Sequence, residues 1–354
     1  MNLVRLRMVV GNGSSDSTRP FFMRSGYSQI PVEIRKFSLV LTVLAAAFFF
    51  VGGVSSAAAQ TSSSAKNYLK HGIERYLARD FEAAIADFSE GIAINSGLVK
   101  LPRTNPGTLR FNHTQRSAVA DDGNIVVADA FNALAYYNRG IVWNTIGDFD
   151  RAIDDFDNAI RINPRYTDAY LTRGRAWHSK GNIDKAIADY NRAIALDPRS
   201  TFAYNNRGIA RKDMQDLAGA ISEFDTAITI NPSLIQAYIN RGAARCAVGD
   251  LAGATSDLNH AIANEPNNPM AFNNRGTTRE AAGDFNGALD DYSKAILLDP
   301  ENTLAFVNRG LMRLRQGNVA EAERDLNHAL QLRPELKPSI ERFLQRENQP
   351  DEER

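Results

Sequence analysis

Residues that could do chemistry are present in this chain, but their spacing forms no catalytic or metal site. The sequence has no glycine-rich phosphate loop with its lysine, no H-E-x-x-H and no G-x-S-x-G. His260 and His328 occupy equivalent places two structural units apart, about 20 Å from each other, which is too far to share a metal ion. Asp154 and Asp155 are helix neighbours that point about 100° apart. The single cysteine, Cys246, is best interpreted as a packing residue, so we expect no enzyme, no metal and no cofactor.

Composition and charge narrow the class of partner. The chain has 354 residues, of which 44% are hydrophobic and 23% are charged, as in ordinary soluble proteins. Its 41 basic residues balance 41 acidic ones, so no excess charge favours nucleic acid. The charge balance therefore predicts no nucleic-acid partner and names no other partner, and the lack of a catalytic constellation predicts no small-molecule substrate.

The first 59 residues have the features of an export signal. Arg35 and Lys36 precede an uncharged apolar run, residues 37–54, and Ala57 and Ala59 follow in the spacing that signal peptidase recognises. We expect cleavage after Ala59 and a location in a bacterial periplasm. The alternative is an uncleaved anchor with the rest of the chain outside the membrane, because the run is just long enough to span a bilayer. The sequence fits a translation start at Met1 and one at Met23 equally.

A 34-residue period organises the rest of the chain. The dipeptide Arg-Gly recurs at that interval as Arg139-Gly140, Arg173-Gly174, Arg207-Gly208, Arg241-Gly242, Arg275-Gly276 and Arg309-Gly310. An aromatic residue stands four positions before each glycine, alanines stand twelve and nineteen positions after it, and a proline closes each unit.

These spacings suit pairs of antiparallel helices. Tyr136 and Gly140 share one face of a first helix, while Ala152, Phe156 and Ala159 share one face of a second. A glycine that faces alanines lets two helices approach closely. A turn glycine and a capping aspartate separate the helices of a pair, and the proline ends the second helix.

Together these residues resemble the tetratricopeptide repeat, whose 34-residue unit combines an aromatic residue, a small residue, A-x-x-x-F and a closing proline. Six contiguous units fill residues 133–336, and a seventh at residues 65–98 has Tyr68, Gly72, Ala84, Phe88 and Gly91 in the same places. The resemblance implies an all-α, right-handed superhelical solenoid of about seven helix pairs. One departure recurs: where the family usually has leucine before the glycine, this chain has arginine in all six later units, most often as Asn-Arg-Gly.

Each of these arginines has a predicted partner in the second helix of its own unit. An acid lies fifteen residues after each glycine, and the predicted ion pairs are Arg139 with Asp155, Arg173 with Asp189, Arg207 with Glu223, Arg241 with Asp257, Arg275 with Asp291, and Arg309 with Asp325. Because the offset does not vary, we interpret this ladder as a device that maintains the fold rather than as a ligand site.

Three further segments flank or interrupt the repeats. Residues 99–132 carry no repeat signature; the short apolar runs at 109–111 and 125–127 could pair as a hairpin over the groove, or the segment could be a disordered insertion. Residues 335–346 predict a capping helix with Ile340, Phe343 and Leu344 on one side, and residues 347–354 form a charged tail.

The remaining candidates for function line the first helices. A mostly amide column stands two residues before each glycine, at Asn138, Thr172, Asn206, Asn240, Asn274 and Asn308. The family resemblance implies that such amides hold an extended peptide backbone in the concave groove, whereas an equally open reading is that they bond within their own repeat. Positions that vary would provide specificity: Tyr137, Leu171, Asn205, Ile239 and Asn273 before the glycine, and His178 and Lys212 after it.

The sequence therefore predicts an exported, non-catalytic scaffold or adaptor of the cell envelope that binds a peptide or a partner's segment in its concave groove. The alternative is a structural repeat protein that associates with itself through its ends or through residues 99–132.

Overall fold

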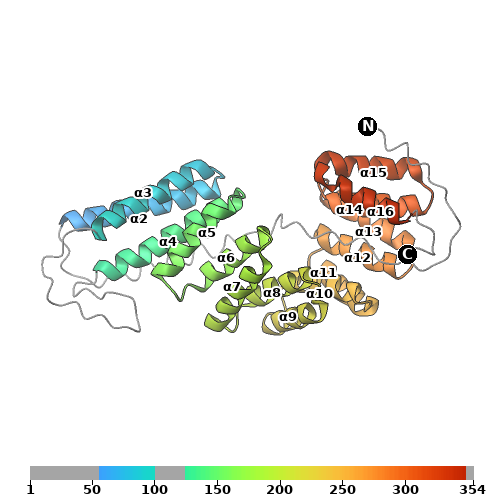
Figure 1. Ribbon diagram of the computed structural model, residues 1–354, viewed down its shortest axis with the longest axis horizontal. Helices are drawn as coiled ribbons and strands as arrows, with labels where there is room; N and C mark the ends of the chain where they lie inside the picture. The colour runs from blue at the N-terminus through green and yellow to red at the C-terminus, as the bar shows by residue number, and fades with distance from the viewer. Residues whose placement is uncertain (1–55, 100–123, 348–354) are drawn as a thin grey trace. The chain divides into compact units, whose positions relative to one another are not determined.

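The computed structural model describes residues 56–99 and 124–347, which form fifteen α-helices and one short 3₁₀ helix (Figure 1). They belong to two compact units, and the division falls between Asn206 and Arg207, inside α8. The predicted apolar export segment, the middle of the predicted insertion and the charged tail lie outside the described residues. No helix among the described residues is long and apolar enough to cross a membrane.

The N-terminal unit contains three complete helix pairs and the start of a fourth. The pairs are α2 (Ser56–Leu77) with α3 (Phe81–Val99), α4 (Asn124–Thr145) with α5 (Phe149–Ile162), and α6 (Thr167–Ser179) with α7 (Ile183–Leu196), followed by α8 (Thr201–Asp213). Each helix contacts its partner in the pair, and α3 contacts α4 just as α5 contacts α6. The described part of this unit is thus a row of consecutively stacked helix pairs.

The C-terminal unit continues the same pattern from the second half of α8. Its helices are α9 (Leu217–Ile230), α10 (Ile235–Ala247), α11 (Leu251–Asn264), α12 (Pro269–Ala281), α13 (Phe285–Leu298), α14 (Thr303–Arg315) and α15 (Val319–Leu332). The chain then forms a 3₁₀ turn, η2 (Pro334–Leu336), and a last helix, α16 (Lys337–Glu347). Ile340 and Leu344 of α16 are buried against Val307, Leu311 and Leu326, so α16 covers the apolar side of the α14–α15 pair.

The contact between the helices of a pair explains the repeating glycine. A Cβ atom added to Gly140 would lie 2.7 Å from Cε1 of Phe156, and one added to Gly174 would lie 2.6 Å from Cε1 of Tyr190. Real side chains cannot approach that closely, so only glycine lets the second-helix ring lie against the first helix. Ala152 and Ala159, on either side of Phe156, are fully buried, as the spacing predicts.

The turns inside the pairs also follow the sequence. Gly147 has φ of +84°, a left-handed conformation that disfavours other residues. The carboxylate of Asp148 then accepts a hydrogen bond from the backbone N–H of Arg151 and caps α5. Four of the six other equivalent turns also have a left-handed glycine, while Arg79 and Gln215 hold the same place with φ of +62° and +65°.

One sequence prediction about the insertion is wrong. Residues 125–127 do not pair as half of a hairpin; they lie near the start of α4, which begins at Asn124. The apolar residues from 125 to 135 continue into the helix that carries Tyr136, and helical continuation satisfies their backbone groups without a partner strand. The other half of the proposed hairpin, at residues 109–111, falls outside the described residues.

Candidate functional site

All six predicted pairs of arginine and acid are formed. In each pair the arginine Nη2 lies 2.6–2.8 Å from a carboxylate oxygen of the second helix. In five of them Nε also donates to the other carboxylate oxygen, which makes the bidentate geometry that guanidinium favours. The acids are only 3–7% exposed, so the ladder lies between the two helices of each pair, where a partner cannot reach it.

The arginines make a third contact that the sequence analysis did not identify. Arg241 Nη1 donates to Asp225 at 2.6 Å, Arg275 Nη1 to Asn259 at 2.8 Å, and Arg309 Nη1 to Ser293 at 3.1 Å, each in the preceding repeat. In the N-terminal unit Arg173 likewise pairs with Asp157. The available signal was a polar residue sixteen positions before each of these arginines. Each such arginine therefore joins its own helix pair to the preceding one.

The amide column is largely used inside the protein. Asn138, Thr172, Asn206 and Asn240 are each less than 10% exposed. Asn138 Nδ2 donates to the backbone oxygen of Leu134 at 2.8 Å, and Thr172 Oγ1 donates to that of Asp168 at 2.8 Å. These bonds within a first helix match the second of the two open readings of this column.

The other amides of the column bond to neighbouring side chains. Asn308 Nδ2 donates to Asn273 Oδ1 of the preceding repeat at 3.0 Å, and Asn273 Nδ2 lies 3.4 Å from Asn274 Oδ1. Asn205 Nδ2 lies 3.5 Å from Asn206 Oδ1. The pairs link adjacent amides rather than presenting them to a partner.

Several variable positions are also less accessible than expected. Ile239 is fully buried in a cluster with Ile235 and Leu258, and Asn205 and Asn273 are 3% and 8% exposed. His178 is 6% exposed. The side chain of Ile239 packs between its own helix pair and the next one. The prediction that Ile239 contacts a partner is therefore wrong, because Ile239 is a core residue. Tyr137, Leu171 and Lys212 remain half-buried.

The first helices of the N-terminal unit present tyrosines. The rings of Tyr137 and Tyr166 lie 4.8 Å apart, and the hydroxyl of Tyr76 lies 3.3 Å from Thr145 Oγ1. Burial, with the nearby charge of Asp168, raises the pKa of Tyr137 far above its ordinary value, so its hydroxyl stays protonated. These half-buried aromatic surfaces and hydroxyl groups suit contact with a partner chain.

In the C-terminal unit, polar and charged side chains of neighbouring helices bond to one another. Glu280 of α12 accepts from Arg315 Nη1 of α14 at 2.5 Å and from the hydroxyl of Tyr292 at 2.7 Å. The thiol of Cys246 is buried, which raises its pKa and disfavours a reactive thiolate. Burial lowers the pKa of Lys212, and the charge of Asp213 partly opposes that change.

Comparison with known proteins agrees with this architecture. Tetratricopeptide repeat models match residues 145–201, 203–234 and 273–336. The chain is a tetratricopeptide repeat protein. A tetratricopeptide repeat protein from Parabacteroides merdae superimposes with a TM-score of 0.61 at 16% identity, over 78% of this chain and 97% of that one. PilW, a type IV pilus biogenesis factor, gives a TM-score of 0.52 at 20% identity over 60% of this chain and 98% of that one. At these identities the likeness concerns the fold.

A sequence relative matches over one short stretch. The TPR repeat-containing thioredoxin TTL4 of Arabidopsis thaliana is 37% identical over 57 residues, which are 16% of this chain and 8% of that protein. The match is therefore limited to a small part of a much longer protein.

In this tetratricopeptide repeat protein, no group of three or more histidine, cysteine or acidic side chains among residues 56–99 and 124–347 could hold a metal ion.

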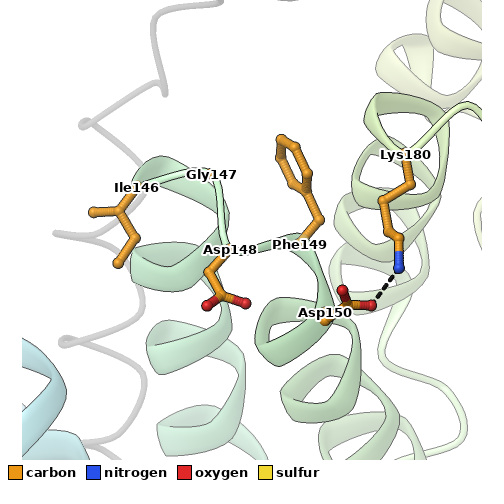
Figure 2. Close-up of a pocket in the computed structure, with 6 residues that line it drawn as sticks. All are labelled: Ile146, Gly147, Asp148, Phe149, Asp150 and Lys180. Carbon is orange, nitrogen blue, oxygen red and sulfur yellow. Dashed lines mark hydrogen bonds and ion pairs between the residues drawn. The ribbon is translucent and has the colours of Figure 1, made fainter.

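The edge formed by the turns of the tetratricopeptide repeats has a depression and exposed apolar side chains. Figure 2 shows the depression, of about 440 Å³, which is lined by Ile146–Asp150 and by Lys180. Lys180 points to Asp150 and forms an ion pair with it across the opening. At the turns inside the helix pairs of the C-terminal unit, exposed apolar residues recur from repeat to repeat; Met214, Val248, Phe285 and Val319 are 46–52% exposed.

Proposed function

We infer that this tetratricopeptide repeat protein is a non-catalytic scaffold of the cell envelope that holds an extended segment of a partner protein against the first helices of its N-terminal unit. The observation that carries the proposal is that hydrogen-bonding groups of the N-terminal unit are left without partners, whereas the position equivalent to Asn144 is satisfied in the sixth repeat. In the N-terminal unit, Tyr137, Leu171 and Arg175 are half-buried, and Arg175 Nε and Asn144 Oδ1 have no hydrogen-bond partner. In the C-terminal unit, Glu280, which stands four residues after its repeat glycine as Asn144 does, accepts from Tyr292 and from Arg315.

Unmet hydrogen-bonding groups beside aromatic surface favour a polypeptide partner. A peptide backbone offers both donors and acceptors, and half-buried tyrosine rings provide contact area at a low cost in conformational entropy. Solenoids of stacked helix pairs provide such surfaces along their first helices.

Export to the envelope is part of the proposal and rests on the sequence. Arg35 and Lys36, the uncharged run at 37–54, and the alanines at 57 and 59 support it. If the signal is cleaved as expected, the first residue of the mature protein is Gln60. Terminal sequencing of the protein purified from the cell envelope tests this, and an intact start at Met1 or Met23 would favour the anchored form.

Site-specific photocrosslinking tests where the partner binds. A photoreactive residue replaces Leu171, which is half-buried on α6, in one full-length protein, and replaces Ala188, which is exposed on the second helix α7, in a matched control. We expect a distinct crosslinked protein from position 171 and not from position 188. Crosslinking from position 188 alone would place the partner on the second helices and contradict the proposal.

A second candidate, self-association, is favoured by the exposed apolar side chains at the turns of the C-terminal unit. Val248 and Phe285 are 50% and 47% exposed, and exposed large apolar side chains at successive turns offer a partner apolar surface to cover. If two copies pair through this edge, the mass in solution rises with concentration, and the double substitution Val248→Ser, Phe285→Ser keeps the protein monomeric. A constant monomeric mass for the unmodified protein would exclude this candidate.

A further inference from the structure

The first repeat lacks one member of the ladder of arginines and acids. The residue directly before the repeat glycine is His71 there, while it is arginine in the six later repeats. The acid that this arginine binds is kept, because Asp87 stands fifteen residues after Gly72 and is 5% exposed. His71 itself is exposed. The first repeat therefore has the buried carboxylate of the ladder without its own arginine.

One oxygen of this carboxylate has no partner. Arg75 Nη1 lies 3.0 Å from Asp87 Oδ1. Asp87 Oδ2 is buried and has no hydrogen-bond partner among residues 56–99 and 124–347, so His71 does not take the role of the missing arginine. A charged oxygen that has lost water and gained no donor disfavours the folded state. This cost points to a donor that comes from another molecule.

The C-terminal unit shows which donor fits. Asp257 holds two guanidinium groups at once, with Arg241 Nη2 at 2.6 Å from Oδ1 and Arg245 Nη1 at 2.9 Å from Oδ2. The sixth and seventh repeats have the same arrangement. Arg75 corresponds to Arg245, because both stand three residues after the repeat glycine. The oxygen of Asp87 that lacks a partner is thus the one that the first arginine binds in the later repeats.

The first repeat also keeps the aromatic residue beside which that guanidinium lies. In five of the later repeats, Cζ of the ladder arginine lies 5.4–5.7 Å from the centre of the ring four residues before the glycine. Tyr68 stands at this position and is half-buried. A planar guanidinium is attracted to a ring face and binds carboxylate oxygens in a fixed geometry, whereas the ammonium of lysine is a strongly hydrated point charge. The place therefore suits arginine better than lysine.

The absence of the arginine opens a way to the acid. In the six formed pairs the chain's own arginine fills the space in front of the acid, which closes the pair to a partner. The side chains of these arginines are 14–22% exposed, so the space reaches the surface. Arg139 is also held by Ser89 of the preceding helix pair, at 2.8 Å. Among the described residues no helix pair precedes α2 and α3, so the equivalent side of the first repeat is not covered by one.

We propose that Asp87 binds the guanidinium group of an arginine supplied by another polypeptide chain, which completes the ladder at the first repeat. The incoming group donates to Asp87 Oδ2 while Arg75 keeps Oδ1, and the ring of Tyr68 lies beside it. The inference does not rest on the proposed function, because the acid belongs to the second helix α3 and the bound group is a cation. A different protein and a second copy of this chain offer the same group.

Three short peptides test the proposal on the full-length protein. They carry arginine, citrulline or lysine at the centre of an otherwise identical run of glycine and serine, and both ends are blocked. Citrulline has nearly the shape of arginine and no charge. Binding is measured by calorimetric titration. We expect the arginine peptide to bind about tenfold or more tightly than the citrulline peptide, and more tightly than the lysine peptide.

Two substitutions at one exposed position give a matched pair of variants. His71→Arg places the arginine of the later repeats, so the chain fills the place itself. We expect it to raise the unfolding midpoint and to weaken binding of the arginine peptide by about tenfold or more. His71→Ala removes the imidazole, leaves the place open and should retain binding. Glu90→Gln, at an exposed acid of α3, controls for the general charge of the helix and should also retain binding.

The other outcomes decide against the proposal or identify the source of the arginine. Equal binding by His71→Arg and the unmodified protein would overturn it, as would equal binding of the arginine and citrulline peptides. Failure of the arginine peptide to bind would do the same, whatever the midpoint of His71→Arg. Where the peptide binds as expected, a dimer that dissociates in His71→Arg assigns the arginine to a second copy, and a constant monomeric mass assigns it to a different protein.

Discussion

The two units differ three residues after the repeat glycine. In the N-terminal unit the second and third repeats have Trp143 and Trp177 there, and each ring lies under a cation of the second helix, at 3.8 Å from Arg151 and 4.0 Å from Lys185. The first repeat has Arg75 there, which pairs with Asp87. The C-terminal unit has a second arginine at every equivalent place, namely Arg211, Arg245, Arg279 and Arg313. Three of these bind the same buried aspartate as the first arginine at 2.7–2.9 Å, and Arg211 lies 3.3 Å from Glu223.

This difference changes how much each buried acid depends on one partner. Asp257 is bound by both Arg241 and Arg245, whereas Asp189 is bound by Arg173 alone among the described residues. The same backbone arrangement is thus stabilised by paired arginines in the C-terminal unit and by single arginines with stacked tryptophans in the second and third repeats. The repeats thus keep one fold while the pairing of arginines with buried acids varies. The polar groups that lack a hydrogen-bond partner vary with it.

The largest expected effect comes from removing the first arginine in each unit. Arg173→Leu leaves Asp189 buried without a cation, and we expect a loss of about 3–5 kcal/mol in the free energy of unfolding. Arg241→Leu leaves Asp257 bound to Arg245, and we expect the protein to fold with a loss of about 1 kcal/mol. The chain's two tryptophans are both in the N-terminal unit, so urea unfolding followed by fluorescence reports that unit, and circular dichroism reports both. Equal losses would refute the difference between the units.

The loss in Arg173→Leu should depend on pH. Burial, opposed by Arg173, already raises the pKa of Asp189 above 3.8, and removing the arginine raises it further. The neutral carboxyl is then the form that the fold favours, so its contribution to stability is present below the unfolded pKa and is lost as the pH rises through the folded value. We therefore expect the gap between variant and unmodified protein to shrink when the pH is lowered from about 7 to about 4. A gap that widened at acidic pH would contradict this sign.

A smaller effect should follow from filling the space at a repeat glycine. In Gly174→Ala the new Cβ would lie 2.6 Å from a ring carbon of Tyr190, and in Gly242→Ala it would lie 2.9 Å from Leu258 Cγ. A rigid ring beneath the helix adjusts less easily than a leucine, so we expect losses of about 2–3 kcal/mol and about 1–2 kcal/mol respectively. Thermal unfolding measured on both variants tests the order, and a reversed order would show that the ring is free to move.

The smallest expected effect is a gain in stability. Gln215 holds the left-handed turn position, with φ of +65°, that Gly147 and Gly181 hold in the N-terminal unit. Because a side chain disfavours this conformation, Gln215→Gly should stabilise the C-terminal unit by about 0.5–1 kcal/mol. Gly147→Ala should destabilise the N-terminal unit by a similar amount. Unfolding midpoints that moved the other way would show that side-chain contacts of Gln215 outweigh backbone strain.

Local geometry made part of this protein predictable from its sequence. The constant interval of 34 residues placed each glycine, ring and alanine of a helix pair, because two helices that touch closely need small and large residues at fixed offsets. The same reasoning paired each repeat arginine with its acid, since both lie on facing helices at a fixed separation. Gly147 and Asp148 marked a turn and a helix cap because their roles depend on the backbone nearby.

Only the tertiary structure decided which of these residues a partner can reach. The sequence placed Asn240 and Ile239 on the first helix, and packing of one helix pair on the next then buried both. The contact of Arg241 with Asp225 joins two repeats, so it depends on how they stack as well as on the period. The unmet donors of Arg175 and Tyr190 emerged in the same way, because whether a polar group has a partner depends on every element packed around it, and one helix does not contain that information.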